Sequence, residues 1–479
     1  MNATIRRTSV ALGVLILALM INANVIAIIQ NDSLRAQDGN RRQIIDEYDQ
    51  QRGSILVGRK TVAKSVATDE RLRYLRVYSD GPAYAPATGY YSVYGATGIE
   101  KAENDLLAGT DDRLFVDRLT TLFSGQQQQG GNVVLTLDAD AQAAAFDGLD
   151  GQEGAVAAID PRTGAILAMA SSPSFDPNLL ASHDPTEVSE SYDKLRKDPG
   201  DPLLNRSIQQ VYPPGSLFKV VVSAAALSSG EYTPDTEIPG PTLLDLPETS
   251  ATIGNYFDGP CLGGSVTLTE ALAISCNTAF AKVGLKLGDQ AINQQAERFG
   301  FNKRIEVPLD VAPSVYPDDL NAPQTAQSAI GQFDVRATPL QMAMVAAGVA
   351  NDGVVMTPYL VAEERAPDLA ALDITEPKPL SRAVSPEVAE ELQAMMVTVV
   401  SNGTGSGAAI PGVSVGGKTG TAQDGKRPPH VWFMAFAPAE DPQVAVAVIV
   451  ENGGRLGDDA TGGAVAGPIA REVMEAVLP

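Results

Sequence analysis

Two apolar segments that lie far apart in the chain each have the pattern of a β-hairpin. Gly154–Ile159 and Ala165–Ala170 flank the turn Asp-Pro-Arg-Thr-Gly, and His430–Pro438 and Gln443–Val450 flank Asp441-Pro442. We expect strands from both ends of this region to share one antiparallel sheet. Helices must then cover the sheet, with a mainly helical insertion between the hairpins. This predicts an α/β (α+β) fold.

The chain begins with a basic pair, Arg6 and Arg7, followed by an almost unbroken apolar run from Val10 to Ile29. At the rise of an α-helix this run is long enough to cross a bilayer. The basic flank predicts a short cytoplasmic N-terminus, residues 1–9, with everything after about residue 30 outside the cell membrane. We expect a retained transmembrane signal anchor over residues 10–30. A cleaved signal peptide is the alternative, but no small-x-small cleavage site follows the run.

The length, charge and histidine content of the chain limit the number of domains and the kinds of ligand that we expect. The 479 residues, 44% of them hydrophobic, can build one large core and at least one smaller domain. A net charge of −23 argues against a nucleic-acid partner, which needs clustered Lys and Arg. The two histidines, His183 and His430, lack ligand-like spacing, so we expect no metal, and nothing indicates a cofactor.

Residues 31–131 are polar and alternate strand-like pieces, such as Leu75–Tyr78 and Tyr90–Tyr94, with short helices. They are typical of an α+β pedestal. The run Gln126–Gly131 is a low-complexity joint and predicts a boundary, with a second domain over residues 132–479. Within the second domain we predict a strand followed by a capped Ala-rich helix, mainly helical structure from about 205 to 350, a solvated Pro-, Glu- and Asp-rich stretch, and helices over Pro386–Val400 and Ala464–Val477.

The stretch Val211–Leu227 is where we expect the chemistry to centre. Two prolines and a glycine interrupt the chain before an apolar helix, so Ser216 falls in the first turn. Positions three apart share one helix face, which predicts the Ser216 hydroxyl within hydrogen-bonding range of Lys219. A buried, neutral lysine can act as a base for a serine nucleophile. A second copy, Ser191–Lys194, lies in a charged stretch, and we interpret it as solvated.

Two further motifs follow the serine. Ser275-Cys-Asn277 comes after a predicted helix over Leu268–Ile274, on a short loop that could point both polar side chains into a cleft. Lys418-Thr-Gly420 lies on a predicted strand, where the glycine would let a substrate backbone approach closely. Each motif alone is weak, but Ser-x-Asn and Lys-Thr-Gly each occur once in the sequence, and both follow Ser216-x-x-Lys219 in this order.

Together the three motifs resemble those of the penicillin-binding proteins and class A β-lactamases. The chain most resembles a class B penicillin-binding protein, a membrane-anchored D,D-transpeptidase whose N-terminal region is non-catalytic. Further matching segments are Arg52-Gly-Ser-Ile55, Gly331-Gln332 and Trp432-Phe433, and Phe333 stands where many relatives carry a second glycine. No transglycosylase region precedes the pedestal, so we expect a monofunctional enzyme.

The resemblance assigns a role to each motif residue. Ser216 would attack the D-Ala-D-Ala carbonyl of a peptidoglycan stem peptide, Lys219 would take its proton, and Ser275 would relay a proton to the leaving D-alanine. Lys418 would help keep Lys219 neutral and attract the substrate carboxylate. The resemblance implies that the substrate also contacts the Asn277 amide, the Thr419 and Thr421 hydroxyls, the backbone at Gly420, and an oxyanion hole formed by the N–H groups of Ser216 and Thr421.

The sequence contains two cysteines, Cys261 and Cys276, and in an oxidising exterior we expect them to form a disulfide. The alternative is a pair of buried thiols. The implied partners are stem peptides as donor and amine acceptor, β-lactam antibiotics, the membrane, and a glycan polymerase with other cell-wall synthesis proteins.

Two other functions remain open at this point. A β-lactamase or β-lactam sensor shares the nucleophile, but no segment supplies the base that deacylation by water needs. A catalytically silent cell-wall scaffold is disfavoured by three intact motifs. Sequence leaves the septal, polar or lateral role undecided.

Overall fold

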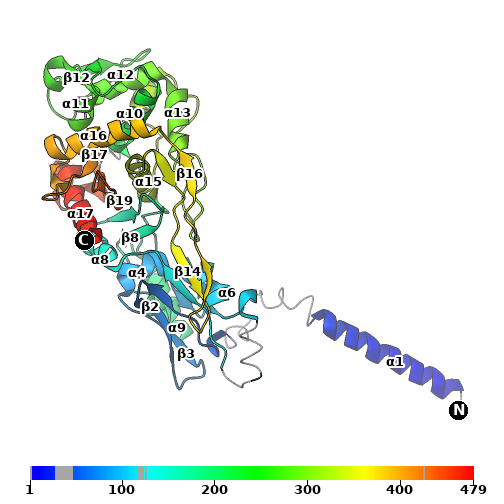
Figure 1. Cartoon of the computed structure of the whole chain (residues 1–479). Helices are drawn as coiled ribbons and strands as arrows, with labels where there is room; N and C mark the ends of the chain where they lie inside the picture. Colours follow the sequence, from blue (N-terminus) through cyan, green and yellow to red (C-terminus); the bar gives the residue numbers. More distant parts are fainter. Residues whose placement is uncertain (1–2, 27–46, 116–122, 124–126, 424–426, 479) are drawn as a thin grey trace.

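The structure is a computed structural model that describes residues 3–26, 47–115, 123, 127–423 and 427–478 (Figure 1). Helix α1 is Ala3–Asn24. Its segment Ile5–Asn24 is long and apolar enough to cross a membrane, and none of it is buried. The helix covers most of the predicted anchor, of which residues 27–30 lie outside the described residues.

The central element of the catalytic region is a five-stranded antiparallel sheet with the strand order β17-β18-β19-β7-β8. Its strands are β7 (Gly154–Ile159), β8 (Ile166–Ser172), β17 (Gly416–Ala422), β18 (His430–Ala437) and β19 (Val444–Val450). The two predicted hairpins meet where Ala445 of β19 pairs with Ile159 of β7. This pairing confirms that the ends of the region share one sheet.

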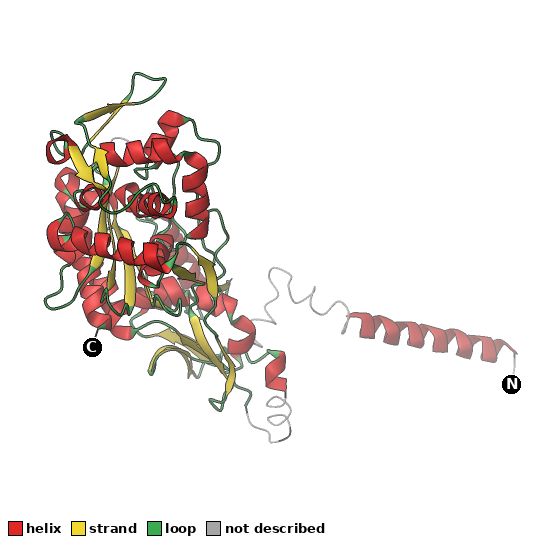
Figure 2. Ribbon diagram, turned by 45° about the horizontal axis from the view of Figure 1, so that its top comes forward, coloured by secondary structure: helices red, strands yellow, loops and turns green. Residues whose placement is uncertain are grey.

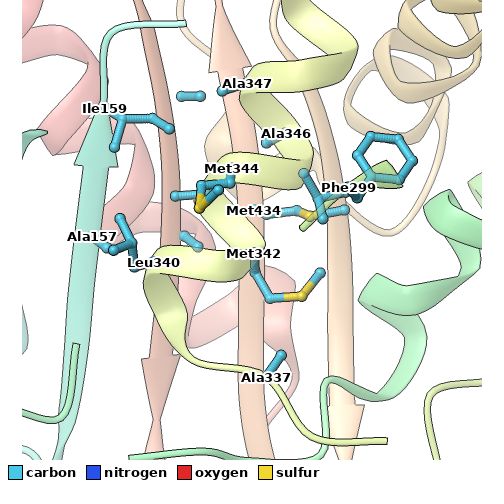
Figure 3. Packing of buried hydrophobic residues seen from close by; sticks show 14 of the residues in the cluster. Ala157, Ile159, Phe299, Ala337, Leu340, Met342, Met344, Ala346, Ala347 and Met434 are labelled. Atoms are coloured by element: carbon cyan, nitrogen blue, oxygen red, sulfur yellow. The ribbon is translucent and has the colours of Figure 1, made fainter. Parts of the chain in front are cut away.

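Helices cover both faces of this sheet (Figure 2). Alternate residues of β7 point to opposite sides, so Ala157 and Ile159 join one apolar cluster while Val156 joins another. On the first side lies the fully buried helix α15 (Pro339–Ala350), whose Leu340 and Met344 pack towards the strands in Figure 3. On the other side lie α8 (Ala139–Leu149) and α17 (Gly462–Val477).

A mainly helical part stands at one end of the sheet (Figure 1). It contains α10 (Lys219–Ser228), α11 (Leu268–Ala273), α12 (Asn277–Leu287), α13 (Asp289–Arg298) and α14 (Ala322–Ser328), and α16 (Pro386–Asn402) packs beneath it. Small ladders join β9 (Glu237–Pro239) to β12 (Ser265–Thr267), β10 (Leu243–Asp245) to β11 (Thr252–Gly254), and β13 (Val354–Met356) to β16 (Pro379–Arg382).

A second sheet, of six strands, combines three strands of the pedestal with three from residues 132–479, in the order β15-β14-β6-β1-β2-β3. Its strands are β1 (Ile55–Val57), β2 (Lys60–Ala67), β3 (Tyr74–Tyr78), β6 (Asn132–Leu135), β14 (Val361–Arg365) and β15 (Ala371–Ile374). The stretch that we expected to be solvated therefore contributes two strands. Its polar composition misled us because β14 is only partly buried and β15, at the sheet edge, is mostly exposed.

Shorter elements complete the described chain. In the pedestal they are α4 (Gly81–Thr88), β4 (Tyr91–Ser92), β5 (Gly95–Ala96), α5 (Gly98–Ala102), α6 (Asn104–Leu107) and η2 (Asp112–Leu114). The catalytic region adds η3 (Pro177–Leu180), α9 (Pro185–Lys197), η4 (Gly215–Phe218), η5 (Cys261–Gly264), η6 (Ser406–Ala408) and η7 (Glu451–Asp459).

A buried ion cluster fixes the pedestal core. The Glu100 carboxylate accepts hydrogen bonds from Arg52 Nε at 2.7 Å and from Arg76 Nε at 2.6 Å, and from the Tyr78 hydroxyl at 3.1 Å. Burial alone would raise the pKa of Glu100, but Arg76 and Arg52 hold it below the ordinary value. The Arg52 motif therefore has a structural role at the base of β1.

Replacing Glu100 with Gln is expected to destabilise the pedestal by about 3–5 kcal/mol, because two buried guanidinium groups lose their counter-charge. A lowered denaturation midpoint in urea would measure this loss. The matched control is Asp193→Asn, which breaks an exposed pair with Lys197 and should leave the midpoint unchanged. An unchanged midpoint for Glu100→Gln would show that the cluster contributes nothing to stability.

Candidate active site

Ser216 lies in η4, a single turn of 3-10 helix that leads directly into α10. The sequence predicted the first turn of an α-helix, and the tighter turn is the local difference. Ser216 lines a cleft of about 740 Å³, between the helical part and the edge strand β17. The cleft wall also contains Ser275, Asn277, Thr419, Gly420 and Thr421.

Three glycines allow the Ser216 turn to lie directly against its neighbours. Gly215 has φ 53°, and a Cβ there would stand 2.6 Å from the Thr421 carbonyl oxygen. A Cβ on Gly331 would stand 1.9 Å from the carbonyl oxygen of Gly215. A Cβ on Gly420 would meet Leu217 Cγ at 3.0 Å. Gly420 also lines the cleft, and its approach to a substrate backbone stays a prediction.

Lys219 is fully buried below the cleft. Its Nζ lies 2.8 Å from the Ser275 carbonyl oxygen, 2.7 Å from Asn277 Oδ1 and 3.2 Å from Ser275 Oγ. Within the described residues no hydrogen bond joins Lys219 to Ser216, so the direct contact that we predicted from helical spacing is absent. Lys219 is instead held by the Ser275 motif.

Ser275 and Lys418 complete a buried chain of polar groups. Lys418, on β17, is fully buried, and its Nζ donates to Ser275 Oγ at 2.9 Å and to the Thr419 carbonyl oxygen at 3.0 Å. Ser275 Oγ therefore stands between the two lysine amines. Ser275 has φ 59°, a left-handed conformation that an ordinary residue adopts at a cost of about 1–2 kcal/mol.

Both lysines lose basicity in this environment. Burial, and secondly the charge of Lys418, lower the pKa of Lys219 well below its ordinary value. Burial also lowers the pKa of Lys418, to about 7. Both effects favour the neutral amine, which has two N–H groups for the Ser275 carbonyl and Asn277 and one lone pair for a proton.

The three remaining candidate residues, Asn277, Thr419 and Thr421, lie around the polar groups of Lys219, Ser275 and Lys418. Asn277 begins α12, and its Nδ2 donates to the Gly254 carbonyl oxygen at 3.0 Å. Thr419 is nearly buried, and its hydroxyl is hydrogen-bonded to that of Thr404 at 2.6 Å. Thr421 is exposed on β17, facing the cleft.

Other residues of the cleft escaped the sequence analysis. They belong to the hairpin formed by β10 and β11, to the segment Asn255–Tyr256, and to the segment Thr461–Gly463, which lies against β17 at Gly420. A Cβ on Gly462 would stand 2.8 Å from the Gly420 carbonyl oxygen. None of these segments has a motif of its own, so only the tertiary structure could have placed them.

Cys261 and Cys276 are joined by a disulfide that closes a loop of 15 residues in sequence separation. Both residues are fully buried. The bond attaches the residue between Ser275 and Asn277 to the loop before β12. It therefore holds the Ser275 turn from outside the cleft.

The second Ser-x-x-Lys copy lies elsewhere. Ser191 and Lys194 are in the middle of α9, which Asp184 caps, so the stretch does contain a helix start that we had not predicted. Lys194 is exposed, and neither residue lines the cleft.

Phe333 adopts a backbone conformation that favours glycine. Its φ of 59° lies in the left-handed region, close after Gly331 at 71°. The loop that supports Gly215 therefore has a strained residue at this position.

The chain matches two protein families. Residues 154–475 match the penicillin binding protein transpeptidase domain, and residues 52–133 match the penicillin binding protein A dimerisation domain. The peptidoglycan D,D-transpeptidase PbpA of Mycolicibacterium smegmatis is 48% identical over 491 residues, which cover 100% of this chain and 99% of the relative. The PbpA of Mycobacterium tuberculosis is 45% identical with the same coverage.

Solved structures of penicillin-binding protein A have the same fold as this chain. The ceftriaxone acyl-enzyme of penicillin-binding protein A from M. tuberculosis superposes with a TM-score of 0.88 at 45% identity, covering 91% of this chain and 100% of that one. Its penicillin G acyl-enzyme gives 0.86 at 45% identity, with 90% and 100% covered. The chain therefore belongs to the class B penicillin-binding proteins, the serine-type peptidoglycan D,D-transpeptidases.

Proposed function

We propose that this chain cross-links peptidoglycan by forming an acyl-enzyme on Ser216 with release of D-alanine, and that β-lactams inhibit it by acylating the same serine. The observation that carries this proposal is the buried chain of Lys219, Ser275 and Lys418 beneath the cleft that Ser216 lines. A neutral amine next to a hydroxyl is the base that a serine nucleophile needs.

In the acylation step Ser216 Oγ attacks the carbonyl carbon of the penultimate D-alanine, and Lys219 Nζ takes the hydroxyl proton. For this step Lys219 Nζ, which lies 3.2 Å from Ser275 Oγ, must direct its lone pair towards Ser216. The proton then passes through Ser275 Oγ to the amine of the leaving D-alanine. Lys418 donates a hydrogen bond to Ser275 Oγ at 2.9 Å and so stabilises the negative charge that this oxygen gains when it gives up its proton.

The edge strand β17 binds the substrate. An edge strand offers unpaired backbone groups to an extended peptide, and Thr421 is exposed there. The N–H groups of Ser216 and Thr421 form the oxyanion hole, where one donor typically contributes about 3–4 kcal/mol. Asn277 contacts the substrate amide, which requires it to exchange its bond to Gly254. The hydroxyls of Thr419 and Thr421 bind the carboxylate.

Helix α1 is the basis for placing the chain relative to the cell membrane. We infer that residues 1–9 are cytoplasmic, that residues 10–30 anchor the chain in the membrane, and that the pedestal of residues 31–131 and the catalytic domain of residues 132–479 lie outside. The basic residues Arg6 and Arg7 before the apolar segment support this orientation. The pedestal is the expected contact for a glycan polymerase and other cell-wall synthesis proteins.

Labelling with fluorescent penicillin, followed by mass mapping of the acylated peptide, tests the proposed function. The expected result is one stable adduct on Ser216. Fast hydrolysis of the drug without adduct would favour a β-lactamase, and complete inertness towards it would favour a silent scaffold.

The rate of acylation is expected to fall on both sides of neutral pH. Below the lowered pKa of Lys219, protonation removes the base. Above about 7, where burial places the pKa of Lys418, this lysine loses the charge that attracts a carboxylate. The amines of Lys219 and Lys418 titrate as a coupled pair, so the pH dependence of the acylation rate gives apparent pKa values that belong to the pair. In Lys418→Arg the charge is permanent, and an alkaline limb that persists in this variant would contradict the assignment.

A further inference from the structure

The side chain at the cap position of helix α12 serves only one of the first N–H groups of the helix. The first N–H groups of a helix have no partner within the helix and need one from outside. The residue at the cap position is Cys276, whose sulfur is bonded to Cys261. This sulfur accepts a hydrogen bond from the Ala279 N–H at 3.4 Å and leaves the N–H groups of Asn277 and Thr278 to a partner from outside the helix.

Asn255 supplies this partner from another segment. Its Oδ1 accepts from the N–H of Asn277 at 3.1 Å and from that of Thr278 at 3.2 Å. Its Nδ2 donates to the carbonyl oxygens of Pro241 and Gly259, each at 3.2 Å. Both ends of the amide are thus used, and the side chain joins the loop after β11 to the start of α12.

This contact lies directly behind the lysine chain. Asn277, whose backbone Asn255 holds, places its own Oδ1 at 2.7 Å from Lys219 Nζ. The carbonyl oxygen of Ser275, two residues earlier, lies 2.8 Å from the same amine. The backbone of Ser275 has a left-handed conformation. Such a conformation persists only where neighbouring contacts hold it.

We propose that Asn255 is a positioning residue for acylation, which caps α12 and thereby keeps the Ser275–Asn277 turn in the geometry that places the Lys219 amine. Asn255 lines the cleft, but its polar atoms are all bonded to the protein, so it acts through the helix start. This inference rests on the proposed function, because it concerns the rate at which Ser216 is acylated.

The test is the rate constant of acylation by fluorescent penicillin in the full chain, measured below the unfolding temperature and normalised to the titrated active sites. Asn255→Ala should lower the rate by on the order of tenfold to a hundredfold, the range that small misplacements of catalytic groups produce. The control is Thr249→Ala in the same hairpin, which loses a hydrogen bond to the Ala251 N–H but has no contact with the turn and should match the parent.

Hydrogen exchange separates positioning from a general loss of stability. In Asn255→Ala the amides of residues 277 and 278 should exchange faster while the rest of α12 stays protected. Asn255→Asp keeps an acceptor oxygen and should restore their protection. Acylation of Asn255→Ala at the parent rate, or unchanged exchange at the helix start, overturns the inference. A parent chain without adduct on Ser216 would instead refute the proposed function.

Discussion

Replacing Ser216 with alanine is expected to abolish covalent labelling by fluorescent penicillin while the catalytic domain stays folded. The variant removes the attacking oxygen. The Ser275 hydroxyl, which lies between both lysine amines, does not replace it, because Ser275 is only 4% exposed. Gel fluorescence with the intact chain measures the labelling. An unchanged melting temperature shows that the fold is retained.

The matched control for this variant is Ser191→Ala, which removes the serine of the second Ser-x-x-Lys copy on α9. It should label as the parent does, because Lys194 is exposed and neither residue of this copy lines the cleft. Undiminished labelling of Ser216→Ala, or an adduct mapped to Ser191, would refute the assignment of the nucleophile.

Replacing Lys219 with arginine should slow acylation by two orders of magnitude or more, that is, by roughly 3 kcal/mol or above in the barrier. A guanidinium is always charged and cannot accept the serine proton. The substitution also places a permanent charge beside Lys418 in a site where burial already disfavours one charge. Stopped-flow kinetics with a chromogenic β-lactam give the rate constant.

Lys194→Arg is the control, since it preserves an exposed charge and should have no effect. Lys219→Arg that acylates at the parent rate would show that another group takes the proton. Partial recovery of Lys219→Arg at high pH would contradict the permanent charge on which the prediction depends.

Much of this architecture could be predicted from local patterns. The hairpins β7–β8 and β18–β19 are continuous apolar runs separated by turn residues, so their sequence alone defined them. The three motifs were recognisable because each occupies a short stretch of chain. The anchor helix was predictable from length and composition.

The parts that could not be predicted depend on contacts between distant segments. Helical spacing suggested that Lys219 contacts Ser216, but a buried amine needs several acceptors, and Ser275 and Asn277 supply them across more than 50 residues. Asn255 lies in a polar loop without a recognisable pattern. The strands β14 and β15 resemble a solvated linker because their exposed side chains belong to the rim of a sheet.

The six-stranded sheet has a practical consequence for anyone who wishes to shorten the protein. Strand β6 lies between β1 and β14, so a fragment starting at residue 132 would retain β6, β14 and β15 but expose the edge of β6 that β1 normally covers. Bare strand edges recruit other chains, and such a fragment should aggregate. The same pairing means that the pedestal cannot be removed as a separate unit, because β14 and β15 belong to one sheet with β1, β2 and β3.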